Sequence, residues 1–290
     1  MTEIRNILII GRTRNGKSSL ANTLVNKEGN FQEVFKESSR SVSKTKKSQG
    51  EVFEWKEIEY RVVDTIGLGD SKLSDKEVLY NIAETIGMMK DGISHVLFVI
   101  KDTFTPEEKE NFKLLRDVMF ESHVTPYVTI VRTNFEAFRN NNECEEDKQE
   151  LIEESEDIKD IIVNCNGFIH VDNPSLKIIK PDDGDVDEKE REENEKKIAF
   201  RTKSKNKSRE KILDHLKSNY RGNYKLKAWD KIHLKINNYL DLIKKGLQAD
   251  LVEKEKEIII EQVAVIIQKE IPSVAKQQEV KKSWRWCNIL

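Results

Sequence analysis

A single loop motif near the N-terminus constrains this chain more than any other feature. Residues 11–18 read GRTRNGKS, which matches the phosphate-loop pattern G-x-x-x-x-G-K-[ST]. An apolar run at residues 4–10 precedes the loop and predicts a buried strand, and a helical pattern follows it to about Asn26. A strand, a glycine-containing loop and a helix in this order predict a P-loop fold that holds the phosphates of a nucleotide.

The positions of this loop have physical reasons. Backbone N–H groups must wrap around phosphate oxygens, Gly16 permits their close approach, and the helix N-terminus adds positive potential. Lys17 is expected to reach the β- and γ-phosphates, and Ser18 to ligate Mg²⁺. The expected phosphate-side contacts are Gly11, Arg12, Thr13, Arg14, Asn15, Gly16, Lys17, Ser18 and Ser19.

A second motif, DTIG at residues 64–67, stands about 50 residues after the loop. Asp64 can hold Mg²⁺ through its water shell, and the N–H of Gly67 can contact a γ-phosphate. D-x-x-G is a weak motif alone, because many strands end in Asp and a turn glycine, but its distance from the phosphate loop strengthens it. Gly67, Gly69 and Asp70 predict a flexible segment suited to a nucleotide-dependent switch.

Strand and helix patterns alternate over about the first 175 residues. This alternation predicts an α/β P-loop NTPase fold, with a doubly wound, mostly parallel sheet flanked by helices and followed by a C-terminal α-helical extension. A helix is expected to begin at Thr105, with Glu108 completing a capping box. The other expected elements are strands at residues 51–57, 60–64, 95–101, 127–131 and 168–171, and helices at 76–90 and 145–163.

The composition changes after Pro181. Charged residues make up 35% of the chain, against roughly 25% in typical globular proteins. Residues 182–195 are rich in acids and 196–211 in bases, which predicts a solvated helix or linker, with a charged docking surface as the alternative. The expected organisation is a nucleotide-binding domain at 1–180, a charged linker or helix at 181–225, a helical extension at 226–275 and a basic tail at 276–290.

Several classes of protein are disfavoured by composition. The net charge of −2 gives no global electrostatic case for a nucleic-acid partner. The three cysteines have no paired spacing, which favours a reducing compartment over a disulfide framework or zinc site. The apolar run at 258–267 is shorter than the roughly 20 residues of a membrane span, and no secretory signal is recognisable. We therefore expect a cytoplasmic protein.

With its two phosphate-side motifs, the sequence resembles GTPases of the immunity-associated nucleotide-binding family (the IAN or GIMAP group, septin-like P-loop GTPases with an AIG-type G domain). Two more stretches carry the resemblance: residues 41–45 (SVSKT) are similar to a switch segment that usually reads SVT, and residues 92–100 with 104–108 resemble a box peculiar to the family. The resemblance covers about residues 4–175. It implies GTP and GDP as ligands and Mg²⁺ as cofactor, with Ser43 as a metal ligand and Thr45 as the rival candidate.

The base-recognition motif departs from the usual N/T-K/R-x-D. Residues 133–136 read TNFE, so that Glu136 replaces Asp and Asn134 replaces an aliphatic stem that stacks on the base. A carboxylate selects guanine by accepting from its N1–H and exocyclic amine, and an exposed acid at a helix start is the alternative interpretation of Glu136. Asn173 stands where the family places its second base loop, although turn chemistry explains it equally well. The expected base-side contacts are Thr133, Asn134, Glu136 and Asn173.

No catalytic residue is assigned from the sequence. Leu68 follows the D-x-x-G motif, where small signalling GTPases place a water-orienting Gln. Thr13 and Arg14 occupy positions where those enzymes carry glycines, and their side chains would obstruct an inserted arginine finger; Arg14 either covers the phosphates or faces solvent. The resemblance implies slow hydrolysis, accelerated by a partner or by pairing of two G domains in a homodimer or oligomer.

The last four residues, CNIL, read as a C-a-a-X box that favours geranylgeranylation of Cys287. Basic residues and two tryptophans at positions 281–286 supply the second membrane signal that one lipid chain needs. The tail therefore predicts attachment to the cytosolic face of a membrane, with a frayed terminus as the alternative.

Three functions remain open from the sequence. The first is a nucleotide-controlled switch with slow GTPase activity. The second is a nucleotide-binding scaffold without hydrolysis, which Leu68 and the irregular base motif favour. The third is an ATP-using P-loop enzyme, for which no acceptor-substrate base is recognisable.

Overall fold

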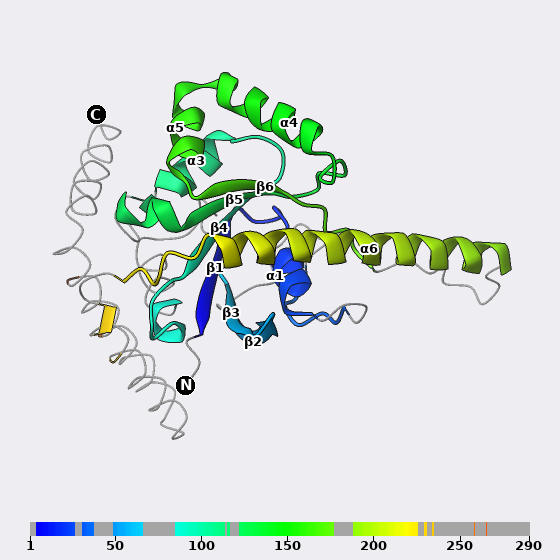
Figure 1. The fold of residues 1–290 in the computed structure, drawn as a ribbon, viewed down its shortest axis with the longest axis horizontal. Coiled ribbons are helices and arrows are strands. Elements are labelled where there is room, and N and C mark those ends of the chain that lie inside the picture. Colours follow the sequence, from blue (N-terminus) through cyan, green and yellow to red (C-terminus); the bar gives the residue numbers. More distant parts are fainter. Residues whose placement is uncertain are drawn as a thin grey trace, which may run out of the picture.

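Over the residues that it describes, the computed structural model contains a six-stranded sheet with helices on both faces (Figure 1). Five strands run parallel and one edge strand is antiparallel, so the predicted doubly wound, mostly parallel α/β fold is confirmed. The structure describes residues 4–26, 31–37, 49–65, 85–113, 115–116, 122–176, 188–225 and 229–230, together with positions 234, 258 and 265.

The strand order is β2-β3-β1-β4-β5-β6. Strand β2 pairs with β3 antiparallel, and every other pair is parallel. The carboxyl ends of β1, β3, β4, β5 and β6 therefore meet at one edge of the sheet, where α/β proteins bind their ligands. The strands are β1 (Arg5–Gly11), β2 (Gln49–Trp55), β3 (Ile58–Asp64), β4 (His95–Ile100), β5 (Val128–Arg132) and β6 (Gly167–His170).

Each face of the sheet has its own hydrophobic core. Strand β1 is buried on both sides: Leu8 and Ile10 join the core under α3, α4 and α5, whereas Ile7 and Ile9 join the core under α1 and α6. This two-sided burial explains the continuous apolar run of the strand. The described helices are α1 (Lys17–Val25), α3 (Pro106–Lys113), α4 (Asn141–Glu154), α5 (Glu156–Asn164) and α6 (Glu188–Ser218), with a 3-10 turn η2 (Ser122–Tyr127).

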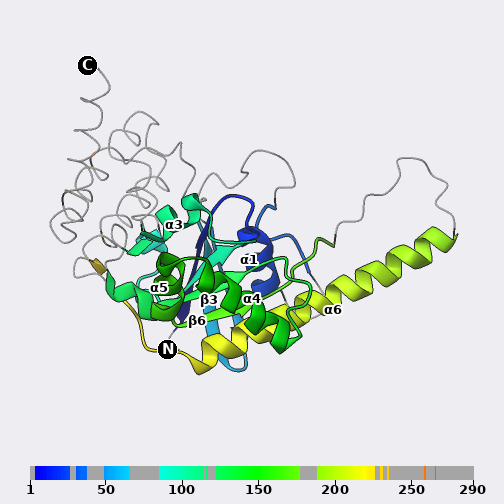
Figure 2. The same cartoon turned by 90° about the horizontal axis from the view of Figure 1, so that it is seen from above.

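The region expected as a charged linker or helix contains α6, a continuous helix of 31 residues. Its N-terminal half extends beyond the rest of the fold, and its C-terminal half crosses the sheet beside α1 (Figures 1 and 2). Ile212, Leu213 and Leu216 are fully buried in the core on that face. The second half of α6 therefore belongs to the same packed domain as the sheet.

Of two predictions about helix ends, one is confirmed and the other is wrong. The capping box is confirmed, because Thr105 Oγ1 accepts from Glu108 N at 3.3 Å and Glu108 Oε2 accepts from Thr105 N at 2.8 Å. The single helix expected at residues 145–163 is wrong: Ser155 is extended, ends α4 and caps α5 by accepting from Ile158 N at 3.3 Å. The cap at Ser155 overrides the helical propensity of its neighbours.

Several predictions lie outside the described residues. These include the switch residues Ser43 and Gly67, the neighbouring Leu68, most of the helical extension and the tail with Cys287. At the start of the extension, Trp229 is buried in the sheet core and donates from Nε1 to Met89 O at 2.8 Å. None of the described helices has the length and apolar character needed to cross a bilayer.

Candidate nucleotide-binding site

The phosphate loop links the end of β1 to the start of α1. A turn closes at its tip, where Arg12 O accepts from Asn15 N at 3.3 Å. Arg14 and Gly16 both have positive φ, 75° and 86°, so the chain curls tightly before the helix begins. This curl brings the first N–H groups of α1 to the carboxyl edge of the sheet, where they can face an anion.

Asn15 fixes the loop from within. Its side chain is buried, and Nδ2 donates to Val99 O at 3.0 Å and to Glu108 Oε1 at 2.7 Å. Its backbone oxygen accepts from Thr133 Oγ1 at 2.7 Å. The loop is therefore clamped by β4, by the start of α3 and by the segment after β5. The box at residues 104–108 thus has a structural role in holding the loop.

Lys17 is a buried cation in the floor of the loop. The residue is 7% exposed, and Nζ donates to Arg12 O at 3.0 Å. Burial lowers the pKa of Lys17 to about 8, although the nearby Asp64 carboxylate opposes this shift. A desolvated ammonium with donors to spare is suited to phosphate oxygens, whose charge would restore its pKa.

Asp64 and Ser18 meet beside Lys17 and fit a magnesium site. Ser18 Oγ donates to Asp64 Oδ2 at 2.8 Å, and Asp64 is 1% exposed at the end of β3. Among the described residues, Asp64 Oδ1 has no hydrogen-bond partner, and burial raises the pKa of the carboxyl against the opposing charge of Lys17. A hydroxyl and a buried carboxylate oxygen are the hard donors that Mg²⁺ prefers. The predicted metal ligands Ser18 and Asp64 are therefore brought together.

The segment after β5 occupies the expected base side. Thr133 is buried and donates to the phosphate loop and to Ile100 O at 3.2 Å, so its side chain faces the loop. Asn134 has a positive φ of 56° and is exposed, as is Glu136. Phe135 N donates to Val171 O at 3.1 Å, which joins this segment to the loop after β6.

Asn173 is the most unusual residue of the base side. It is 7% exposed, and neither Nδ2 nor Oδ1 has a hydrogen-bond partner among the described residues. Its backbone oxygen accepts from Ser19 Oγ at 3.2 Å, which ties the loop to α1. A buried amide without partners is costly, so this amide is suited to a polar ligand.

Helix α6 holds the loop that carries Asn173. Ser208 Oγ accepts from Asp172 N at 3.1 Å and donates to Asp172 O at 2.7 Å, and Ser204 Oγ donates to Asp172 Oδ2 at 3.2 Å. Burial raises the pKa of Asp172, and the negative charge of Glu136 raises it further. Together with the bond from Phe135 N to Val171 O, this shows that the two base-side loops converge.

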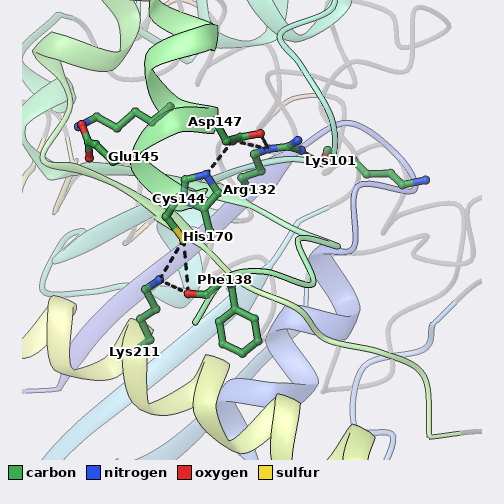
Figure 3. A network of polar contacts seen from close by, with 9 residues as sticks. Lys101, Arg132, Phe138, Cys144, Glu145, Asp147, His170 and Lys211 are labelled. Atoms are coloured by element: carbon green, nitrogen blue, oxygen red, sulfur yellow. Dashed lines mark hydrogen bonds and ion pairs between the residues drawn. The ribbon is translucent and has the colours of Figure 1, made fainter. Parts of the chain in front are cut away.

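A polar network lies beneath the base side, as Figure 3 shows. Asp147 of α4 accepts from Arg132 Nε at 2.9 and 2.7 Å and from His170 Nε2 at 2.7 Å. Lys211 of α6 donates to Phe138 O at 2.7 Å, so α6 also holds the segment that leads into α4. The network fixes the ends of β5 and β6, from which both base-side loops depart.

Comparison with known proteins agrees with this geometry. The profile of the AIG1 family matches residues 5–176, which is more than half of the chain. The chain belongs to the AIG1 family. It is 30% identical over 166 residues to immune-associated nucleotide-binding protein 12 of Arabidopsis thaliana, covering 56% of this chain and 40% of that protein. It is 29% identical over 150 residues to protein 1 of the same series, covering 51% of this chain and 62% of that protein.

The matched region is therefore a shared domain within longer relatives. The chain spans less than half the length of the first curated relatives that it matches, such as 46% of immune-associated nucleotide-binding protein 13. Among solved structures, Toc33 from Arabidopsis thaliana in complex with Mg²⁺ and GMPPNP overlaps with a TM-score of 0.44 at 15% identity, covering 72% of this chain and 87% of that chain. This partial overlap adds nothing to the AIG1 assignment.

Sequence reasoning missed the contribution of α6, which lies beyond the region matched by the AIG1 profile. Ser204 and Ser208 lie one helical turn apart and face Asp172, and the interpretation of this region as a charged helix gave no reason to select them. The pair formed by His170 and Asp147 was likewise not foreseen from the sequence. Serines at i and i+4 in a charged helix are a weak signal, because their target becomes visible only in three dimensions.

Proposed function

We propose that this chain binds guanine nucleotide with Mg²⁺ and hydrolyses GTP slowly, as a nucleotide-controlled switch or a self-associating scaffold. One observation carries the proposal: the buried Lys17 lies in the phosphate loop beside the Ser18–Asp64 pair, and one oxygen of that carboxylate has no partner among the residues that the structure describes. A cation for phosphates and oxygen donors for Mg²⁺ thus share one edge of the sheet. The resemblance of the sequence to GTPases supports guanine nucleotides as the ligands.

On the phosphate side, the residues divide the work. The N–H groups of the loop and the start of α1 face the phosphate oxygens, and Lys17 reaches the β- and γ-phosphates. Ser18 and Asp64 would hold Mg²⁺, directly and through its water shell respectively. Mg²⁺, when bound, neutralises charge on the β- and γ-phosphates. Ser43 and Gly67 are proposed to complete this side in the GTP-bound state.

On the base side, two groups are proposed to recognise guanine. Glu136 would accept from the N1–H and the exocyclic amine, with its longer side chain spanning the extra distance from an exposed position. The amide of Asn173 would contact the base from the opposite loop, because both of its polar atoms are unpartnered among the described residues. Thr133 would act indirectly, by holding the loop at Asn15 O.

The proposed switch depends on segments whose structure is not described. The regions around Ser43 and Gly67 would be ordered by the γ-phosphate and released after hydrolysis, which would change self-association through the G domain. Leu68 in place of a water-orienting Gln supports slow intrinsic turnover. The same residue favours the second candidate, a scaffold that binds nucleotide without hydrolysing it.

The test is binding of fluorescent GDP, GTP and ATP analogues with Mg²⁺ to the full chain and three variants. Lys17→Ala should abolish most binding of all three, and Glu136→Ala should remove the preference for guanine over adenine. Lys159→Ala, which removes an exposed cation paired with Glu156 on α5, is the matched control and should behave as wild type. Equal affinity for ATP that Glu136→Ala leaves unchanged would overturn the guanine assignment and favour an ATP-using P-loop enzyme.

Hydrolysis and self-association need separate measurements. Single-turnover assays with GTP distinguish the switch from the scaffold, since only the switch releases phosphate. Sedimentation with GDP and with a non-hydrolysable GTP analogue tests the proposed homodimer. Identical mass in both nucleotide states would contradict a nucleotide-controlled association.

A membrane location is the last part of the proposal. Prenylation of Cys287, with the basic and tryptophan residues just before it, would place the chain on the cytosolic face of a membrane. Expression in eukaryotic cells of wild type and Cys287→Ser, followed by mass spectrometry and fractionation, tests this. An unmodified Cys287 in the wild type would contradict the lipidation and leave a cytoplasmic protein.

A further inference from the structure

The tip of the phosphate loop carries an arginine where its backbone favours glycine. The hydrogen bond from Asn15 N to Arg12 O closes a four-residue turn, and Arg14 is the third residue of that turn with a φ of 75°. Positive φ at this position is characteristic of type II turns, which select Gly or Asn there. A residue with a long side chain is strained in this conformation, and such strain gathers at functional sites.

The surroundings of Arg14 hold its backbone in place. On one side, Asn15 is anchored by its bonds to Val99 O, Glu108 and Thr133, so the turn cannot relax into a conformation that arginine prefers. The side chain of Arg14, in contrast, is exposed. The loop therefore carries the exposed guanidinium of Arg14 on a backbone that is held in place, next to the proposed phosphate site.

The two arginines of the loop differ in their partners. Arg12 forms an ion pair with Glu107 of α3 at 3.8 Å, whereas Arg14 has no hydrogen bond or ion pair with any residue that the structure describes. Arg12 is thus directed toward α3, whereas no described residue occupies any of the five N–H donors of Arg14. Planar guanidinium donors match phosphate oxygens better than the point charge of a lysine does.

We propose that Arg14 is a catalytic residue of GTP hydrolysis, an arginine supplied by the chain's own phosphate loop. This inference rests on the proposed function. In the reaction, the oxygen of water bonds to the γ-phosphorus while the bond to the β–γ bridging oxygen breaks. The electron pair of that bond passes to the β-phosphate of GDP, and the protons of water leave with inorganic phosphate and solvent. The guanidinium of Arg14 donates to the bridging and γ-phosphate oxygens, where negative charge grows.

The sequence around the site favours a role for Arg14 in stabilising the charge that develops during hydrolysis. Leu68 has no amide to orient water, and we expect the side chains of Thr13 and Arg14 to obstruct an arginine finger that a partner would insert. A cation already on the loop supplies the missing charge without insertion. Other GTPases use an arginine from their own chain in this way, and such residues are worth a large factor in turnover.

The decisive experiment compares wild type with Arg14→Gly and Arg14→Lys in the full chain. Arg14→Gly restores the residue that the turn favours, so the fold should be retained or stabilised. We expect its single-turnover rate of GTP hydrolysis to fall by at least about tenfold. GDP affinity should change by less than about twofold, whereas affinity for the transition-state mimic GDP–aluminium fluoride should fall with the rate. Arg14→Lys should not restore the rate, because it lacks the planar fork.

Lys159→Ala is again the matched control, since it removes one exposed positive charge on α5 and should leave every measurement unchanged. Hydrolysis in Arg14→Gly at the wild-type rate would overturn the catalytic role and leave the proposed GTPase intact. An equal loss of GDP affinity and rate would also overturn it, because Arg14 would then be a binding residue only. Wild type that binds guanine nucleotide without any hydrolysis would overturn it too, while the nucleotide-binding scaffold would survive.

Discussion

The phosphate side of the candidate site and its base side are built in different ways. The phosphate side is one continuous segment that meets Asp64, and its parts are held by partly buried contacts such as the bond from Lys17 Nζ to Arg12 O. The base side joins the loops after β5 and β6, and α6 supports it from a distant part of the chain. A short motif can describe a site formed by one continuous segment. It cannot describe a site to which several separate elements contribute side chains.

This comparison predicts that substitution of Gly11 has the largest effect on stability. A Cβ there would lie 2.4 Å from Val99 O, and φ is +151°, so Gly11→Ala forces two hydrogen-bonded strands apart. We expect the free energy of unfolding to fall by about 3 kcal/mol in urea titrations, the upper end of the cost of overpacking. Gly50→Ala in β2 is the control, because its nearest neighbours lie at 3.7 Å. Equal losses in the two variants would contradict the steric explanation.

Lys17 should give the next largest effect, on binding. Lys17→Ala removes a buried charged donor and should weaken GDP binding by about 3 kcal/mol, roughly 100-fold. In the wild type, affinity should fall as pH rises from 8 to 9, approaching tenfold per pH unit. The sign follows because the bound phosphates require the protonated amine, whose pKa is about 8 in the nucleotide-free protein. Titration calorimetry measures both the loss of affinity and its pH dependence. A pH dependence that persists in Lys17→Ala would exclude Lys17 as its source.

Asp147 tests how the base side is supported. Asp147→Asn leaves Arg132 and His170 without their carboxylate, which should lower the free energy of unfolding by about 2 kcal/mol at pH 7. Burial opposes ionisation of Asp147, but the bonds from Arg132 and His170 hold its pKa below the usual value. The stabilisation is therefore present above about pH 4 and is lost as pH falls through the folded-state pKa.

Urea titrations at several pH values measure this effect. Glu150→Gln, at an exposed position on the same helix, is the control and should stay within about 0.5 kcal/mol of wild type. A penalty for Asp147→Asn that is the same at pH 3 and pH 7 would show that shape, and not charge, explains it.

The structure brings Lys17, Ser18 and Asp64 together as the sequence led us to expect, whereas the sequence outlined the base side only coarsely. Local chemistry explains the difference, because Gly16, Lys17 and Ser18 are consecutive residues of one motif. The limit is clearest in α6, where the buried residues include Lys205 and Arg209. Arg209 lies over the Trp55 ring at 4.6 Å and donates to Leu24 O at 2.9 Å.

Burial of polar residues by such partners cannot be predicted from a hydropathy pattern. From the sequence alone, a helical stripe of serine, lysine and arginine is interpreted as exposed to solvent. Its burial becomes apparent only when the backbone groups and aromatic rings that contact it are known. The end of α4 at Ser155 is a smaller example of the same limit. A serine inside a helical pattern can either lie within one continuous helix or end it and cap the next one.

Ser208 offers the finest test of the comparison. Ser208→Ala removes one hydroxyl that bonds both backbone groups of Asp172, which should lower the free energy of unfolding by about 1 kcal/mol. Because the neighbouring Asn173 then loses its fixed position, the preference for GDP over ADP should fall by roughly three- to tenfold. Binding of inorganic pyrophosphate, which probes the phosphate side alone, should be unchanged. Competition binding with these three ligands separates the two sides, and equal weakening of all three would show that α6 supports the whole site and that the two sides are one unit.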